Sequence, residues 1–257
     1  MPITDKVPPR PQKSGVSVPA APAENLQNTI LLGLPSKERE YVLARCELVH
    51  LPKNAVLNEA GDPIEIVYFV DSGLVSFLTV MGDGKSVEVG LIGKEGFAGV
   101  PLVFGFPSNP TRAVMQVAGN CYRITASNFR DALRDCPTLE KSLQRFSQSM
   151  ALQATQIAAC NRLHEVDRRL ARWLLMSNDR LGENIVPLTQ ETLAHMLGTR
   201  RASVTVAAGI LQKSGLITYR RGDVKIDNRP GLEAASCECY EAIKRQSQKW
   251  LNELRAK

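Results

Sequence analysis

Two adjacent arginines, Arg200 and Arg201, stand at the start of an expected helix. The dipole of a helix favours anions at its N-terminus and cations at its C-terminus, so the helix itself does not explain them. Phosphate oxygens and the edges of guanine bases are suitable partners for guanidinium groups. The alternative is an ordinary solvated face of a three-helix core.

The segment around these arginines, LTQETLAHMLGTRRASVTVAAGILQKSGLI, has the pattern of a helix-turn-helix. Thr189 can cap the first helix. Gly198 can adopt the left-handed conformation that a tight turn between two helices needs, and Thr199 can cap the second helix. In that second helix, apolar spacing predicts one buried face, made by Val204, Ala207, Ala208 and Leu211. The residues that then point outward are Ala202, Thr205, Val206 and Gly209.

The segment GLITYRRGDVKI follows and predicts a hairpin that turns at residues 221–223. A hairpin after the second helix forms a wing, and its Arg220, Arg221 and Lys225 could contact phosphates without reading sequence. We therefore predict nine DNA-contacting residues: Thr189, Gln190, Thr199, Arg200, Arg201, Ser203, Thr205, Arg220 and Arg221.

The charge distribution agrees with this placement. The 257-residue chain has a net charge of +6, yet residues 1–160 carry 15 basic and 15 acidic side chains, whereas residues 161–257 carry 17 and 11. A neutral module joined to a basic one is typical of a protein that meets a polyanion. A basic surface without a partner is the alternative.

The rest of the chain predicts a scaffold. Residues 1–24 are rich in proline and lack aromatic residues, which predicts a disordered tail. Between Cys46 and Ile124, short β-branched runs alternate with turn signals, which predicts an all-β sandwich or barrel. The last stretch, EAIKRQSQKWLNELRAK, predicts an amphipathic helix packed on the winged helix.

From Pro137 onward, residues recur at alternating four- and three-residue spacing, which predicts a long helix with a heptad seam: Leu139, Leu143, Phe146, Met150, Gln153, Ile157 and Cys160. Such a seam can pack on its own β-domain, but its length favours pairing with a second copy, and hence a homodimer. Gln153 either fixes the register of the pair or faces solvent.

With these elements in place, the chain resembles the Crp/Fnr family of bacterial transcription regulators from about residue 25 to residue 233. The residues that carry the resemblance are VYFVDSGLVSF and LAHMLGTRRASVTVAAGILQKSGLI. The resemblance implies an α+β fold with a jelly-roll-like double-stranded β-roll at 25–136, a dimerisation helix at 137–168, a winged helix-turn-helix at 169–235 and a helical extension at 236–257. It also implies a homodimer on a pseudo-palindromic site in double-stranded DNA, with RNA polymerase as a further partner.

The DNA-reading helix departs from the family pattern Arg-Glu-Thr-Val-Ser-Arg. Arg201 is kept, but Ala202 and Val206 replace the glutamate and the second arginine. The lost carboxylate could accept from cytosine and the lost guanidinium could bind guanine, so we expect a different target sequence, with small apolar groups on thymine methyls.

The sensor departs as well. Where family members that bind cyclic nucleotides have Phe-Gly-Glu-x-x-Leu and then Arg-Ser/Thr-Ala, Val100 replaces the glutamate that serves the ribose, and Arg112 is displaced by one position. A shift of one residue on a strand turns a side chain to the other face. We therefore expect no cyclic nucleotide, leave the effector unidentified, and name a candidate effector pocket: Gly99, Val100, Leu102, Arg112 and Ala113.

Other chemistry has less support. Only three histidines are present, too few for a cupin-type metal centre, and no catalytic motif occurs, so we predict no metal site and no enzyme. Cys237 and Cys239 form a C-x-C pair that could bind a soft metal or respond to oxidation; otherwise they are ordinary thiols.

Without a membrane-spanning or signal segment, we expect a cytoplasmic protein. The competing function is a ligand-regulated module whose basic domain meets a protein or RNA.

Overall fold

The computed structural model describes residues 25–220 and 222–255, so the predicted tail lies outside the described residues. Two short helices, α1 (Thr29–Leu32) and α2 (Ser36–Leu43), lead into the N-terminal domain. Within the described chain, this domain has two four-stranded sheets of antiparallel pairs. In spatial order, one sheet consists of β1 (Glu47–Leu51), β8 (Gly119–Thr125), β3 (Ile66–Val70) and β6 (Phe97–Ala98). The other consists of β2 (Val56–Asn58), β7 (Arg112–Val117), β4 (Leu74–Val80) and β5 (Ser86–Ile92).

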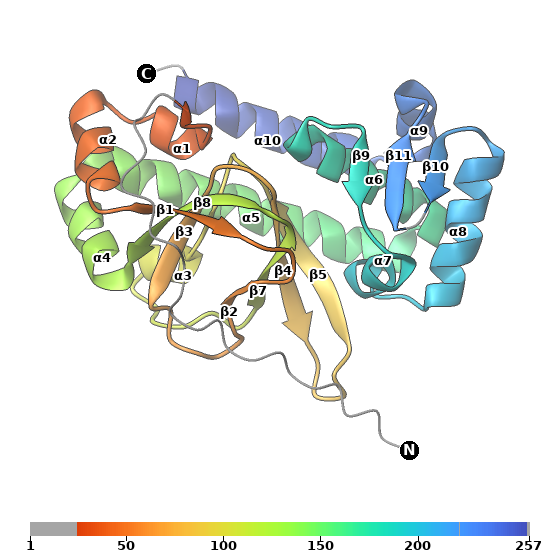
Figure 1. Ribbon diagram of the computed structural model, residues 1–257, viewed down its shortest axis with the longest axis horizontal. Helices are drawn as coiled ribbons and strands as arrows, with labels where there is room; N and C mark the ends of the chain where they lie inside the picture. The colour runs from red at the N-terminus through yellow and green to blue at the C-terminus, as the bar shows by residue number, and fades with distance from the viewer. Residues whose placement is uncertain (1–24, 221, 256–257) are drawn as a thin grey trace.

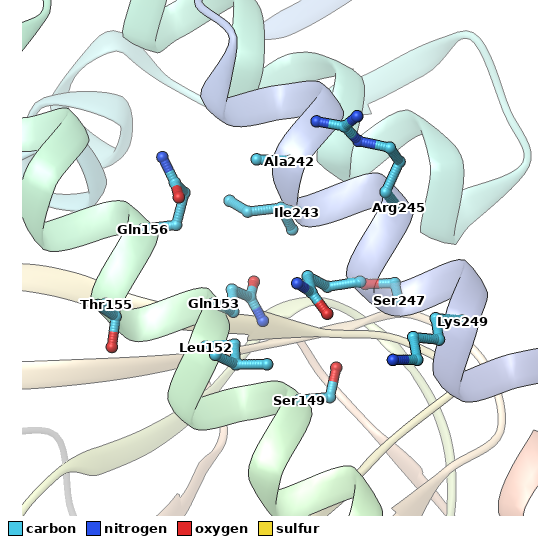
Figure 2. A pocket seen from close by; sticks show the side chains of 11 residues that line it. Ser149, Leu152, Gln153, Thr155, Gln156, Ala242, Ile243, Arg245, Ser247 and Lys249 are labelled. Carbon is cyan, nitrogen blue, oxygen red and sulfur yellow. The ribbon is translucent and has the colours of Figure 1, made fainter.

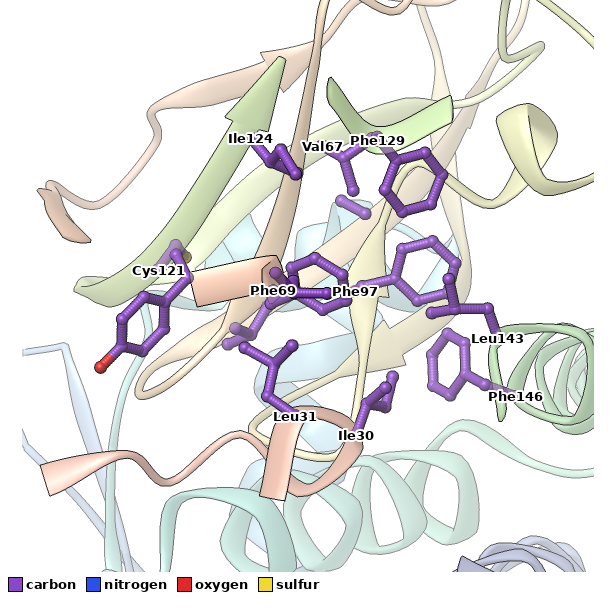
Figure 3. Close-up of a cluster of buried hydrophobic side chains, with 14 of the residues drawn as sticks. Ile30, Leu31, Val67, Phe69, Phe97, Cys121, Ile124, Phe129, Leu143 and Phe146 are labelled. Atoms are coloured by element: carbon purple, nitrogen blue, oxygen red, sulfur yellow. The ribbon is translucent and has the colours of Figure 1, made fainter. Parts of the chain in front are cut away.

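The two sheets form the β-roll, which confirms the expected α+β fold class. Helix α3 (Val100–Val103) interrupts the strands, and α4 (Ala126–Asp135) follows them. The core of the roll is aromatic: the Phe69 and Phe97 rings stack with centroids 5.8 Å apart, and the Phe146 ring lies 5.3 Å from Phe97 (Figure 3). Because Phe146 belongs to the long helix α5 (Pro137–Leu163), that helix completes the core of the roll.

This packing corrects our expectation about the heptad seam. Leu139 and Leu143 are fully buried in the core of their own roll, and Ile157 is buried in a second core of the same chain. Gln153 is buried and does not face solvent: its side-chain amide donates to the backbone oxygen of Leu91 (3.2 Å) and accepts from the backbone N–H of Leu91 (3.4 Å) in the same chain. A heptad pattern reveals an apolar face but not the surface on which it packs.

A winged helix follows α5, with four helices and a three-stranded sheet of order β10-β11-β9 in the described residues (Figure 1). The elements are α6 (Val166–Leu181), β9 (Ile185–Pro187), α7 (Gln190–Leu197), α8 (Arg201–Lys213), β10 (Ile217–Arg220), β11 (Asp223–Ile226) and α9 (Arg229–Ala235). Strand β9 was not predicted from the sequence, because three residues are too few to show the alternation of apolar and polar side chains that marks a strand.

The last helix, α10 (Cys239–Arg255), runs back along α5 and packs mainly on it (Figure 1). It also packs on α6, so the expected contact with the winged helix is the smaller part of its packing. Trp250 of α10 meets the Phe146 ring edge-on at 5.4 Å, so the chain end supports the roll. No helix among the described residues is long and apolar enough to cross a membrane.

A buried joint connects the roll to the winged helix. Leu74, Leu78 and Leu91 on β4 and β5 share a hydrophobic core with residues of α6, α7 and α8. At this joint the Glu88 carboxylate accepts hydrogen bonds from the Ser76 hydroxyl (2.6 Å) and the Trp173 indole (2.8 Å). Burial raises the pKa of Glu88 to about 7, while these two hydrogen bonds lower it.

We expect Glu88 to make folding dependent on pH. Because the pKa of Glu88 is higher in the folded than in the unfolded chain, its contribution to stability is full below about pH 4.5 and is lost as the pH rises through about 7. Glutamine does not titrate, so only the wild type loses stability over this range. The difference in unfolding free energy between Glu88→Gln and the wild type should therefore shift in favour of the variant by up to about 3 kcal/mol from pH 5 to pH 8. Urea unfolding at both pH values measures the difference. An equal difference at the two pH values would contradict a buried, titrating Glu88.

Candidate nucleic-acid interface

Helix α7 begins and ends as its sequence predicts. The Thr189 hydroxyl accepts a hydrogen bond from the backbone N–H of Thr192 (3.2 Å), and Gly198 has a φ of 57°. Thr199, in contrast, does not cap the next helix: its backbone N–H closes the turn by donating to Ala194, and Arg200 holds the N-cap position of α8 without a side-chain cap. The turn is therefore one residue longer than we expected.

Helix α8 has the two faces that its spacing predicts. Val204, Ala207, Ala208 and Leu211 are all buried. On the opposite face Val206 is 65% and Ile210 48% exposed, so two large apolar side chains lie one turn apart on the outer surface of the helix. Figure 1 places α8 at the end of the molecule away from the β-roll, so this face is accessible.

Three side-chain contacts bring the start of α7 and the wing to α8. The Thr205 hydroxyl donates to the Gln190 side-chain oxygen (2.8 Å), which joins the outer face of α8 to the first residue of α7. The Tyr219 hydroxyl on β10 donates to the Leu188 backbone oxygen (2.9 Å). The backbone N–H of Tyr219 donates to the side-chain oxygen of Gln212 on α8 (2.9 Å). The predicted residues of α7, α8 and the wing thus form one surface.

The arginines of this surface are exposed. Arg200, Arg201 and Arg220 are solvent-exposed, and no carboxylate in the described part of the chain forms an ion pair with any of them. Lys225 differs, because its ammonium pairs with Asp227 at 3.0 Å. Ser203 is half-buried, and Arg221 lies outside the described residues. Arg220 lies opposite Asp223 in the ladder of β10 and β11 but forms no ion pair with it. Exposed guanidinium groups that form no ion pair are available to bind an external anion.

The candidate effector pocket is divided between two faces of the roll. Gly99 and Ala113 line a cavity of about 10 Å³ inside it, which is room for about one water molecule. Leu102 is part of the core, and the half-buried Val100 begins α3. Arg112 points to the other face, where its guanidinium pairs with Glu59 at 2.9 Å and lines an open cleft of about 420 Å³ beside α7.

A groove of about 400 Å³ lies between α5 and α10 and was not predicted from the sequence (Figure 2). Eight of its eleven lining residues are polar or charged, among them Gln153 and Gln156 from α5 and Arg245 and Lys249 from α10. The groove exists because α10 folds back on α5, and the pattern of neither helix predicts that.

Cys237 and Cys239 are buried at the start of α10, where they meet Cys160 and His164, two residues that we did not predict as site residues.

Comparisons with known proteins match both domains. A family model described as a cyclic nucleotide-binding domain matches residues 48–136, and one described as a Crp-like helix-turn-helix domain matches residues 168–235. A global nitrogen regulator from Synechocystis is 25% identical over 181 residues, 67% of this chain and 80% of its own. An uncharacterized NTE family protein from Mycobacterium tuberculosis is 29% identical over 147 residues, 56% of this chain. The match spans only about a quarter of that relative's length, 24%.

A solved structure of FixK2 from Bradyrhizobium japonicum superimposes with a TM-score of 0.65 at 17% identity, covering 75% of this chain and 98% of FixK2. At this identity the likeness shows the fold alone. The two family models account for more than half of the chain, in the same order as the β-roll and the winged helix that the structure contains. The chain therefore belongs to the Crp/Fnr family of transcription regulators.

Proposed function

We propose that this protein is a homodimeric, sequence-specific DNA-binding regulator that places α8 in the major groove. The observation that carries the proposal is the outer face of α8, where exposed apolar side chains lie beside guanidinium groups that have no carboxylate partner among the described residues. Arg201 would read a base edge, and Arg220 on the wing would hold a phosphate. RNA polymerase is the further partner that we expect, with both acting in the cytoplasm.

A dimer interface is available on the exposed side of α5, opposite the face that packs on the roll. Solvent-exposed residues recur there at alternating four- and three-residue spacing: Gln144, Gln148, Ala151, Thr155, Ala158 and Arg162. The small side chains in the middle of this strip would let two α5 helices approach closely. We call these six residues the α5 strip and propose that it pairs with its copy.

Acidic residues in the α5 strip should separate the dimer. If two α5 helices pair in parallel, Ala151→Glu and Thr155→Glu together bring like charges face to face across the two-fold axis. We expect the mass in solution, measured by light scattering after size exclusion, to fall from two chains to one of 28.2 kDa. Ser127→Glu, an exposed position on α4, is the matched control and should stay dimeric. A dimer that survives both strip substitutions would contradict this interface.

We propose that the effector of the roll is not a cyclic nucleotide. The small cavity in the roll is far below the roughly 300 Å³ that a bound nucleotide-sized ligand requires. Val100 offers no oxygen to a ribose, and Arg112 is already paired with Glu59. The signal, whatever its chemistry, would act by favouring one arrangement of the two winged helices over another.

Fluorescence anisotropy tests the function. The purified protein is titrated with labelled fragments of its own upstream region, with random duplex and with single-stranded RNA, at two salt concentrations, with and without cyclic AMP. We expect tight binding to one duplex without the nucleotide, and a steep loss of affinity at higher salt. Equal binding to random duplex in every condition, or a preference for RNA, would overturn the proposal. Binding only with cyclic AMP would overturn our account of the roll.

A further inference from the structure

Three cysteines and one histidine meet where α5 ends. Cys160 lies in the last turn of α5 and His164 is its C-cap, while Cys237 and Cys239 flank the junction of α9 and α10. The Sγ atoms of Cys160 and Cys237 are 3.5 Å apart, and Cys239 Sγ lies 3.6 Å from His164 Nδ1. All four potential ligand atoms lie within 4.8 Å of one another. We call these four residues the Cys₃His cluster.

These separations suit a single tetrahedral ion. Bond lengths of about 2.3 Å from zinc to sulfur and about 2.0 to 2.1 Å to nitrogen place neighbouring ligand atoms about 3.6 to 3.8 Å apart. The two measured pairs lie close to these values, so small side-chain shifts would suffice to close the site. An iron–sulfur cluster puts several atoms between its thiolates and needs more room than the Cys₃His cluster offers.

Two further side chains, Glu238 and Gln156, contact members of the cluster. The His164 Nε2 atom lies 3.2 Å from a carboxylate oxygen of Glu238, which leaves Nδ1 directed at the thiols. Metal-binding histidines commonly use their second nitrogen in this way. The Gln156 amide donates a hydrogen bond to Cys239 Sγ at 3.0 Å. The three thiols are also fully buried, at 0 to 2% exposure, and form a cluster apart from both hydrophobic cores.

Two buried cations flank the Cys₃His cluster. Arg169 and Arg172 are 7% and 2% exposed, and the Nε atom of each has no hydrogen-bond partner among the described residues. Both guanidinium groups act electrostatically on Cys160 and Cys237, and Arg172 also acts on Glu88. The carboxylates that act on these two arginines are Glu165 on Arg169 and Glu88 on Arg172, and the pKa of Glu88 is raised by burial, so neutral thiols would leave the two charges incompletely balanced. Three thiolates and a divalent cation carry a net charge of −1 and would help to balance them.

We propose that Cys160, His164, Cys237 and Cys239 bind one Zn²⁺ ion in a closed, four-coordinate structural site. Three sulfurs and one imidazole are a soft ligand set of the kind that selects zinc, and each bound thiol gives up its proton. The ion would tie the α9–α10 junction to the end of α5, beside the only break between α5 and α6 in the described chain, at residues 164–165. Bound zinc would thereby fix the winged helix relative to the roll.

Elemental analysis of the full-length protein, purified under reducing conditions and desalted, tests the proposal. We expect one zinc per chain in the wild type and in Cys46→Ser, whose thiol is remote from the Cys₃His cluster. Cys237→Ser combined with Cys239→Ser should lose the zinc. A chelator should lower the melting temperature of the first two proteins and leave that of the double variant unchanged. A wild type without zinc, or a double variant that keeps it, would overturn the proposal.

A second measurement does not depend on the folding of a variant. Cobalt(II) added to chelator-treated wild type should produce the visible bands of tetrahedral cobalt with thiolate charge transfer, saturating at one ion per chain. His164→Cys should bind one ion with a stronger thiolate band, whereas His164→Ala should bind it more weakly by 10-fold or more. A Cys160–Cys237 disulfide in the freshly isolated chain, acid-labile sulfide, or cobalt spectra without thiolate bands would overturn the zinc site.

Discussion

Replacing Arg201 with alanine is expected to weaken binding to the specific DNA site by about 1 to 3 kcal/mol, roughly 5- to 150-fold, with little change on random duplex. Arg201 begins α8, is exposed, and has no carboxylate partner among the described residues. Its guanidinium can therefore bind a guanine edge with two hydrogen bonds without first breaking an ion pair. The free energy of unfolding should stay almost unchanged, since the side chain is solvent-exposed.

Anisotropy titrations with specific and random duplex at one salt concentration measure both losses. Arg130→Ala on α4 is the matched control, because it removes the same exposed side chain from the far side of the β-roll. It should leave both affinities unchanged. Equal losses on specific and random DNA in Arg201→Ala would mean that Arg201 holds a phosphate and reads no base.

The Trp173→Ala substitution should lower the free energy of unfolding by about 3 to 5 kcal/mol. The Trp173 ring is 1% exposed at the joint between roll and winged helix, and its indole N–H donates to Glu88 at 2.8 Å. Truncation leaves a cavity and takes one of its two hydrogen-bond donors from a buried carboxylate. Because this core is shared by both domains, we expect one cooperative transition to move to lower denaturant.

Urea unfolding followed by circular dichroism measures the loss. Trp173→Phe separates its two causes, because phenylalanine keeps most of the packing but cannot donate to Glu88. We expect an intermediate loss for this variant, of about 1 to 3 kcal/mol. A loss below about 1 kcal/mol in Trp173→Ala would show that the joint contributes little to folding.

The helix-turn-helix could be predicted from sequence because its signals are local. The Thr189 cap and the left-handed Gly198 depend on residues within one turn, and the buried face of α8 follows from its spacing. The replacement of the family glutamate by Val100 can also be recognised within one short stretch of sequence. Where a few neighbouring residues determine the structure, the sequence is sufficient.

Features that depend on distant contacts could not be predicted. The apolar face of α5 was visible, but its packing on the roll was not, and Gln153 shows why: its partner is Leu91, 62 residues earlier. The Cys₃His cluster joins residues of α5 to residues more than 70 positions later. Its local signals, Cys160 and His164 one helical turn apart and the C-x-C pair, are each weak, and only the fold brings them together.

Footprinting on a selected duplex tests the central claim, that a dimer presents two α8 helices to DNA. The full-length protein selects its site from a random library, and hydroxyl radicals then map the protected backbone. We predict two symmetric half-sites in successive major grooves, about 10 base pairs from centre to centre, and their loss in Arg201→Ala. An unselective library, or one unpaired protected segment, would contradict the proposed regulator.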